Sequence, residues 1–192
     1  LRIQARKAVI LAAGGFEHNQ AMREQYLPQP TDHRWSAGTR DNTGDAIREG
    51  IRLGAKMHRM NEAWWCNTIS VPGEEIPRLS IMEKSYPGSI MVNPAGQRFS
   101  NESQNYMAFQ QETFAKHTDE NPLNPSWQIF DANFRATYFV GPLYNSKFLP
   151  DWAVPKRYEE EGFFAKADSI AELARKINVD AAGLQETVHK IN

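Results

Sequence analysis

The sequence predicts an α+β domain together with a piece of a second domain. Three observations support this class: an early apolar run ending in a glycine pair, two strand-like segments much later, and helical segments between them. These elements lack the regular strand–helix–strand rhythm of a parallel α/β sheet. The length supports one domain and part of a second, because a domain has about 150 residues and the chain has 192.

The first element is an apolar run at residues 7–15 that ends in Gly14 and Gly15. A short apolar run bounded by glycine is typical of a buried strand. The two glycines permit a close approach by a ligand, although an ordinary tight turn is the more common explanation of such a pair. A helix is predicted over 19–26, followed by prolines and a polar loop at 31–42.

The next element is the clearest helix of the sequence, at residues 43–61, with Thr43 or Asn42 as its cap. Small and apolar residues recur on one face at spacings of three and four, so this face can lie close to a backbone or a ligand. Thr43, Gly44 and Asp45 form its start. Asp45 either contacts a ligand or is an acidic residue favoured by the helix dipole.

The second half combines two strands with four helices. Strands are predicted at 90–92 and 127–130, and residues 93–96 form a turn from which 97–99 return. Helices are predicted at 101–114, 131–138, 168–177 and 180–191, whereas 141–162 receive no regular structure. The helix at 101–114 would place Glu102 and Tyr106 on one face. Ser169 resembles the start of a capping box, and Asn178 can end that helix.

Composition excludes several classes of function. The 22 basic and 23 acidic side chains balance, which favours neither nucleic acid nor an anionic membrane as partner. The longest apolar run is far shorter than the ~20 residues of a membrane span. The single Cys66 and the scattered histidines predict no metal site, and no internal disulfide is possible. We expect a cytoplasmic protein. Because the chain opens on Leu1 in a strand and stops in a helix, we also expect a fragment.

Seven motifs follow one another in a defined order along the sequence. They lie at residues 7–17, 42–46, 53–55, 62–65, 87–93, 96–102 and 166–192. Together they resemble the fumarate reductase/ketosteroid dehydrogenase superfamily of FAD flavoproteins. The resemblance covers almost the whole chain and is weakest at 141–162.

This resemblance implies a fold and a cofactor. Residues 1–60 would be the remnant of the FAD-binding domain, and 61–192 the substrate-cap or catalytic domain, with most of the Rossmann-like domain missing. No GxGxxG motif is present. The FAD contacts implied by the family are Ala13, Gly14, Gly15, Thr43, Gly44 and Asp45. Ala46 stands where the family usually has glycine.

Two positions separate the branches of the superfamily. Fumarate reductases carry a proton-donating arginine where this chain has Tyr106, and an arginine in the stretch that corresponds to residues 82–86, which has none. The Asn-Glu-Ser-x-x-Tyr pattern is instead similar to ketosteroid dehydrogenases, in which that tyrosine takes the proton beside the ketone. Trp64 and Trp65 would suit a flat apolar steroid.

The resemblance thus implies an FAD-dependent oxidoreductase that dehydrogenates a 3-ketosteroid by passing hydride to flavin N5, with Tyr106 as the catalytic base. The substrate would be a small apolar ketone, and the electron acceptor is not identified. The alternatives are a fumarate reductase-type enzyme, a flavoprotein acting on another enone or ring ketone, and a fragment that is inactive by itself.

Overall fold

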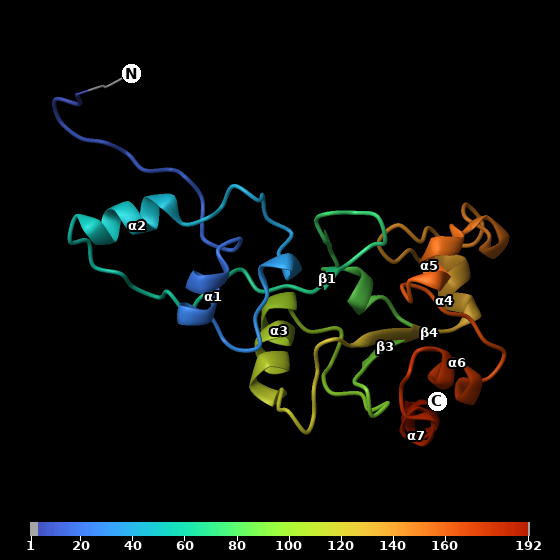
Figure 1. Cartoon of the computed structure of the whole chain (residues 1–192). Helices are drawn as coiled ribbons and strands as arrows, with labels where there is room; N and C mark the ends of the chain where they lie inside the picture. Colours follow the sequence, from blue (N-terminus) through green and yellow to red (C-terminus); the bar gives the residue numbers. More distant parts are fainter. Residues whose placement is uncertain (1–3, 192) are drawn as a thin grey trace. The chain divides into compact units, whose positions relative to one another are not determined.

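The computed structural model describes residues 4–191. The chain divides after Ala63 into two compact units, here called unit 1 and unit 2 (Figure 1). Within residues 4–191, no helix is both long enough and apolar enough to cross a bilayer.

Unit 1 contains α1 (Gln20–Tyr26), the 3-10 helix η1 (His33–Trp35) and α2 (Asp45–Arg52). The α1 helix confirms the prediction for residues 19–26. The Asn19 side chain accepts the Met22 N–H at 3.1 Å and so satisfies a backbone donor at the helix start. The prolines at 28 and 30 follow directly, where the chain leaves the helix.

The predicted strand at residues 7–15 was wrong. This segment forms no regular structure, and Val9 and Ile10 are 71% and 90% exposed. A strand exists through its ladder of hydrogen bonds to neighbouring strands. The described residues of unit 1 contain no strand with which this segment could pair. The apolar pattern is therefore present without the sheet that it requires.

The predicted helix at residues 43–61 is real but much shorter, since α2 ends at Arg52. Gly54 adopts a left-handed φ of 83°, and Ala55 donates its N–H to the Gly50 carbonyl at 2.9 Å. This is the usual glycine termination of a helix. The predicted caps were also wrong: Gly44 is the N-cap, the Asn42 amide donates to Glu17, and the Thr43 hydroxyl donates to Asp45.

Unit 2 is built on an antiparallel strand pair (Figure 1). Strand β3 (Ser89–Val92) pairs with β4 (Trp127–Phe130), with Val92 opposite Trp127, which confirms both predicted strands. Neighbouring residues of β3 face opposite sides. Met91 packs with Phe99, Phe109 and Leu123, where helix α3 (Tyr106–Lys116) lies.

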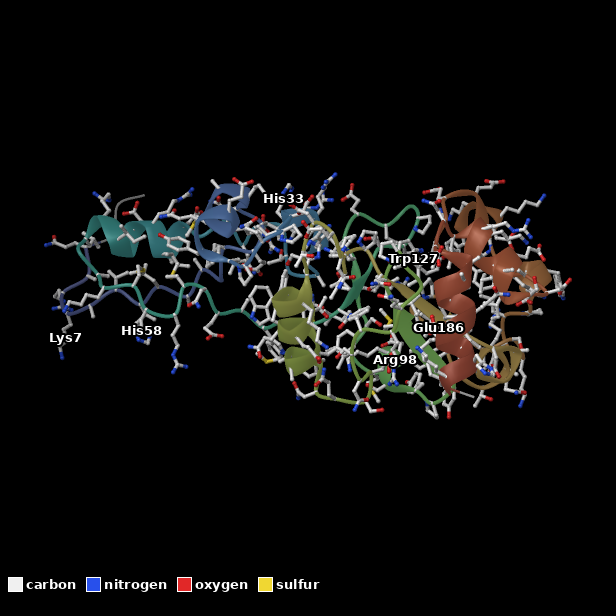
Figure 2. All side chains as sticks on the ribbon, turned by 90° about the horizontal axis from the view of Figure 1, so that it is seen from below. Lys7, His33, His58, Arg98, Trp127 and Glu186 are labelled. Carbon is white, nitrogen blue, oxygen red and sulfur yellow. The ribbon has the colours of Figure 1, made fainter. Side chains whose placement is uncertain are left out.

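The other face of the strand pair carries the C-terminal helices α6 (Ile170–Lys176) and α7 (Ala181–Ile191). Val92 and Ile129 pack there with Ala174, Val179 and Leu184. Val92 lies opposite Trp127 of β4 and forms a bridge to Arg98 on its other side. Figure 2 labels Trp127 and Arg98, and also Glu186 of α7. Both helices were predicted: the Ser169 hydroxyl accepts the Glu172 N–H, and Asn178 ends α6 with a φ of 55°.

The predicted turn after β3 is confirmed. Gly96 donates its N–H to the Asn93 carbonyl at 2.9 Å, and Asn93 donates to the Gln97 carbonyl at 3.1 Å. The returning segment is reduced to a single bridge between Val92 and Arg98. Three short elements that precede β3 were not predicted: the paired strands β1 (Thr68–Ile69) and β2 (Arg78–Leu79), and the 3-10 helix η2 (Glu83–Ser85).

After β4, helix α4 (Ala132–Thr137) begins at Asp131, whose carboxylate accepts the Phe134 N–H. Residues 141–162, for which no regular structure was predicted, contain η3 (Asp151–Ala153) and α5 (Lys156–Glu160). Arg135 holds this region, because its guanidinium donates to the Leu149 carbonyl at 2.6 Å and faces the Asp151 carboxylate. Val71, Leu143, Val154, Tyr158 and Phe164 form the core beneath it.

Candidate active site

Tyr106, the predicted catalytic residue, is the first residue of α3. The helix was expected from residue 101, but residues 101–104 form a turn in which the Gln104 N–H bonds to the Asn101 carbonyl. Asn105 is the N-cap and accepts the Met107 N–H at 2.9 Å. Glu102 therefore lies before the helix, and the expected shared helix face with Tyr106 was wrong.

Glu102 instead ties the turn to β3. Its buried carboxylate accepts the Met91 N–H at 2.9 Å and the Arg98 Nε–H at 3.0 Å. The hydrogen bond to this carboxylate raises the pKa of Arg98. Such charge-assisted bonds are stronger than neutral ones, so they fix the start of the turn against the sheet.

The turn is also held from α3. Glu112 accepts hydrogen bonds from the Ser100 hydroxyl and from the Gln104 amide, and forms an ion pair with Lys116 at 2.5 Å. The bonds from Lys116, Ser100 and Gln104 lower the pKa of Glu112 to about 2. The segment just before Tyr106 is thus bonded on two sides.

A third contact comes from the buried Lys84 of η2, whose side chain is only 1% exposed. Its ammonium donates to the Glu102 carbonyl at 2.7 Å, to the Gln104 carbonyl at 2.8 Å and to the Ser85 hydroxyl. Burial lowers the pKa of Lys84, while the Glu102 carboxylate acts in the opposite direction. Its three donors have three acceptors.

The structure brings Tyr106 together with Trp64. The indole Nε1–H lies 2.8 Å from the Tyr106 hydroxyl oxygen. An indole nitrogen only donates, so the phenolic oxygen is the acceptor and its own O–H remains available to another group. The Trp64 side chain is 76% exposed, which leaves its ring face open.

Trp65 has a different environment from Trp64, although both were predicted to contact substrate. It is 8% exposed and packs edge to face against Phe114 of α3, with ring centroids 5.0 Å apart. This geometry is typical of a buried aromatic pair. Trp64 is therefore the member of the pair with a free face, and Trp65 supports α3.

In unit 1 the structure brings together the two segments predicted to contact the cofactor. Gly44 donates its N–H to the Gly15 carbonyl at 2.9 Å, which joins residues 13–15 to residues 43–45. Asn19 adds a bond from its amide to the Thr43 carbonyl at 2.9 Å. Ala13, Gly14 and Asp45 are exposed, and Gly14 and Gly44 have φ values of 72° and 82°.

These residues fit a ligand that is held by the main chain. Ala13 and Gly14 present exposed backbone with at most a methyl group, so a flat ligand can approach closely. A Cβ at Gly14 would lie 2.0 Å from the Asn42 side-chain oxygen, and one at Gly44 would lie 2.5 Å from the Met22 sulfur. Asn42 and Met22 could move aside, but at these left-handed φ values any residue with a Cβ is strained, so glycine is favoured at both positions. Among residues 4–191, no group of three His, Cys, Asp or Glu side chains is placed to hold a metal ion.

Sequence reasoning missed Lys84 and Glu112. Glu112 lies on a predicted helix, but nothing local indicates that it reaches back to Ser100 and Gln104. Lys84 has the sequence context of a surface lysine, because lysine is almost never fully buried unless paired. The one usable signal was its position in the stretch that lacks the arginine of fumarate reductases.

The chain matches the FAD binding domain family over residues 1–192. It is 37% identical to the 3-oxosteroid 1-dehydrogenase of Mycobacterium tuberculosis, covering 99% of this chain and 33% of that protein. It is 32% identical to the 4-oxocyclohexanecarboxylate 2-dehydrogenase of Sinomonas cyclohexanicum, covering 100% of this chain and 32% of that protein. The chain thus spans about a third of the length of these relatives.

A solved structure is also similar, that of the 3-ketosteroid delta1-dehydrogenase from Sterolibacterium denitrificans in complex with 1,4-androstadiene-3,17-dione. The TM-score is 0.88 at 42% sequence identity, and the match covers 98% of this chain and 33% of that one. The predicted mixed helix and strand fold of the ketosteroid dehydrogenase and fumarate reductase flavoproteins is confirmed, as is the resemblance to ketosteroid dehydrogenases.

Proposed function

Because the chain belongs to the FAD binding domain family of flavoproteins, we propose that it is the substrate-cap part of an FAD-dependent 3-ketosteroid dehydrogenase. In this proposal residues 1–60 belong to the FAD-binding domain and residues 61–192 to the cap. The reaction oxidises a CH–CH unit of the steroid ring to a C=C bond. The electron acceptor that completes the cycle is left open.

The observation that carries the proposal is the placement of Tyr106. A tyrosine, rather than an arginine, begins α3 on a segment bonded to β3, to η2 and to Glu112, and its hydroxyl accepts a bond from Trp64. Rigid support of this kind is what a group that moves a proton requires. Likeness to a ketosteroid dehydrogenase over 98% of the chain supports the same substrate class.

The chemistry follows from the ketone. Its carbonyl acidifies the adjacent C–H. Tyr106, once it has passed its own O–H proton to a neighbouring acceptor, takes that carbon-bound proton as a phenolate while hydride leaves the neighbouring carbon. The Trp64 N–H donates to the phenolic oxygen and so stabilises the phenolate form in which Tyr106 acts as a base. FAD, when bound, supplies the hydride acceptor. Ala13, Gly14, Gly15, Thr43, Gly44 and Asp45 would hold it, mainly through backbone atoms, and the exposed ring of Trp64 would contact the flat steroid.

The test uses the whole protein with its cofactor under anaerobic conditions. Addition of 4-androstene-3,17-dione should bleach the oxidised flavin band at about 450 nm. Product should contain one new ring double bond when an artificial electron acceptor is present. A yellow protein whose spectrum no 3-ketosteroid changes would overturn the substrate, and a colourless protein would overturn the cofactor.

A second substrate class is favoured by one observation. The relative from Sinomonas cyclohexanicum, named for 4-oxocyclohexanecarboxylate, matches the complete chain at 32% identity. A small ring ketone offers the same acidic C–H as a steroid, so the same base would serve. Parallel assays with 4-oxocyclohexanecarboxylate and 4-androstene-3,17-dione distinguish the two, since the true substrate should have the larger kcat/KM.

The 192-residue chain by itself is proposed to be inactive. The exposed run at residues 7–11 lacks a strand partner among the described residues, and no GxGxxG motif is present to hold the pyrophosphate of FAD. The isolated chain should therefore be purified colourless. An isolated chain that carries flavin in stoichiometric amount would contradict this.

A further inference from the structure

We propose that Lys84 is a positioning residue for the base: its buried ammonium fixes the turn at residues 102–104 and thereby the Tyr106 hydroxyl. This inference rests on the proposed function for its catalytic consequence. The contacts that support it belong entirely to unit 2. No other role for this side chain follows from the reaction proposed above.

The first support is where the ammonium bonds. It donates to the carbonyls of Glu102 and Gln104, which precede Tyr106 by four and two residues. These carbonyls belong to a turn, and a turn has fewer internal backbone bonds than a helix to fix its path. One cation thus holds two backbone carbonyl groups of the segment just before the base.

The second support lies on the other side of Tyr106. The Lys84 ammonium is 5.0 Å from the centroid of the Phe109 ring, on the first turn of α3. A cation at this distance from an aromatic ring is attracted to it. Lys84 therefore contacts the chain both before and after Tyr106, so its removal should change the direction in which the phenol points.

The third support is the cost of burying this charge. An ammonium removed from water is unfavourable unless every donor is paired, and an apolar side chain of equal length would fill the same space without that cost. Stability alone therefore gives little reason for a lysine here. A defined geometry at the adjacent turn gives a reason, because three bonds from one atom have a specific direction.

The test replaces Lys84 in the whole protein. Lys84→Met removes the ammonium and retains most of the chain length, whereas Lys84→Gln keeps an N–H donor without the charge. Leu184→Ala is the control. Leu184 is fully buried in the separate cluster with Val92 and Ala174, so its truncation should destabilise unit 2 without changing the contacts of residues 102–104.

Two readouts separate positioning from stability. For Lys84→Met we expect kcat to fall at least tenfold with KM within about twofold, because a displaced base weakens the chemical step and not binding. Lys84→Gln should retain more of kcat than Lys84→Met. Leu184→Ala, with an equal or larger loss of thermal stability, should keep kcat within about twofold.

The other readout needs no activity. In protein labelled with 15N-tryptophan, the Trp64 indole signal is assigned by its loss in Trp64→Phe. Lys84→Met should shift this signal, because the Tyr106 oxygen moves away from the indole N–H, and Leu184→Ala should leave it unchanged. If Lys84→Met fails to fold, Lys84→Gln is compared with Leu184→Ala in its place, both for kcat and for the Trp64 indole signal.

The outcomes distinguish the two proposals. An inactive wild-type protein whose Trp64 signal still responds to Lys84 substitution would defeat the proposed function and keep the positioning role. A Trp64 signal and a kcat that respond no more to Lys84 substitution than to Leu184→Ala would overturn the positioning role, whatever the substrate.

Discussion

The indole N–H of Trp64 donates to the phenolic oxygen of Tyr106 across 2.8 Å, joining a residue in the loop that leads to β1 to the first residue of α3. This bond has only one possible direction, since an indole nitrogen cannot accept. It leaves the Tyr106 O–H free for another partner and supplies a donor for charge on the oxygen. The pair therefore gives the proposed base a hydrogen-bond donor of fixed identity and direction.

Trp64→Phe should lower kcat of the whole protein by roughly 10- to 100-fold, the effect of losing one hydrogen bond to a charged group. Phenylalanine keeps an apolar ring for the steroid, so KM should change little. Trp152→Phe is the matched control, because Trp152 is also an exposed tryptophan of unit 2, at 87%. Steady-state kinetics checks both variants. Equal rates for the two would mean that the Trp64 bond does not act on the base.

Tyr106→Phe should lower kcat by about 10²–10⁴-fold, the usual cost of removing a group that transfers a proton. Binding of the steroid, measured by titration of the oxidised protein, should be unchanged because the ring remains. Tyr144→Phe serves as the control, since Tyr144 is a 60% exposed tyrosine elsewhere in unit 2. A loss below tenfold with intact binding would assign Tyr106 a structural role.

The local capping signals of this sequence were sufficient to predict several elements. Asn19 and Ser169 each cap the helix that follows them, and Asn178 ends α6 in the left-handed region. In each case the deciding contact lies within a few residues. The pairing of β3 with β4 was also predictable in part, because both strands are apolar and a turn follows β3.

The predictions that were wrong share a physical cause. The residues with which these segments would pair are distant in sequence or are not among the described residues. Residues 7–15 have a strand pattern, but no neighbouring strand among the described residues of unit 1 completes the ladder. Glu102 has helical spacing from Tyr106, yet its carboxylate binds Met91 and Arg98, and Asn105 takes over the cap. Tertiary contacts of this kind override local propensity.

Glu112 should make unit 2 sensitive to acid. Its pKa in the folded protein is about 2, below its ordinary value of 4.5, so folding favours the ionised carboxylate. This stabilisation is complete above about pH 4.5 and is lost as the pH falls towards 2, because the unfolded chain takes up the proton first. We expect Glu112→Gln to lower the free energy of unfolding by about 1–2 kcal/mol at neutral pH, after solvent screening of a partly exposed group.

Urea unfolding at about pH 7 and at about pH 3 checks this prediction. The difference between the wild type and Glu112→Gln should shrink at the lower pH. Glu186→Gln is the control, since Glu186 has one exposed ion-pair partner, Lys190, and no bond to the turn. A difference that stays constant between the two pH values would show that the Glu112 carboxylate is not ionised preferentially in the folded state.

Gly96, the glycine of the turn after β3, should be sensitive to substitution. Its φ is 71°, and a Cβ there would lie 2.3 Å from the Leu184 backbone nitrogen and 2.8 Å from the Asp180 carbonyl oxygen. Backbone atoms of α7 cannot rotate away as a side-chain tip can, so Gly96→Ala must displace the helix from the strand pair. We expect a loss of about 3 kcal/mol or more, from left-handed strain and overpacking together.

Gly162→Ala separates these two contributions. Gly162 has nearly the same φ, 74°, but a Cβ there meets nothing within 4 Å. Its substitution should therefore cost only the conformational strain, about 1–2 kcal/mol. Urea midpoints of the two variants give the comparison, and the excess loss in Gly96→Ala measures how tightly α7 is seated on the turn. If the two variants lose the same free energy of unfolding, α7 can shift to make room for a Cβ at residue 96 without a measurable cost.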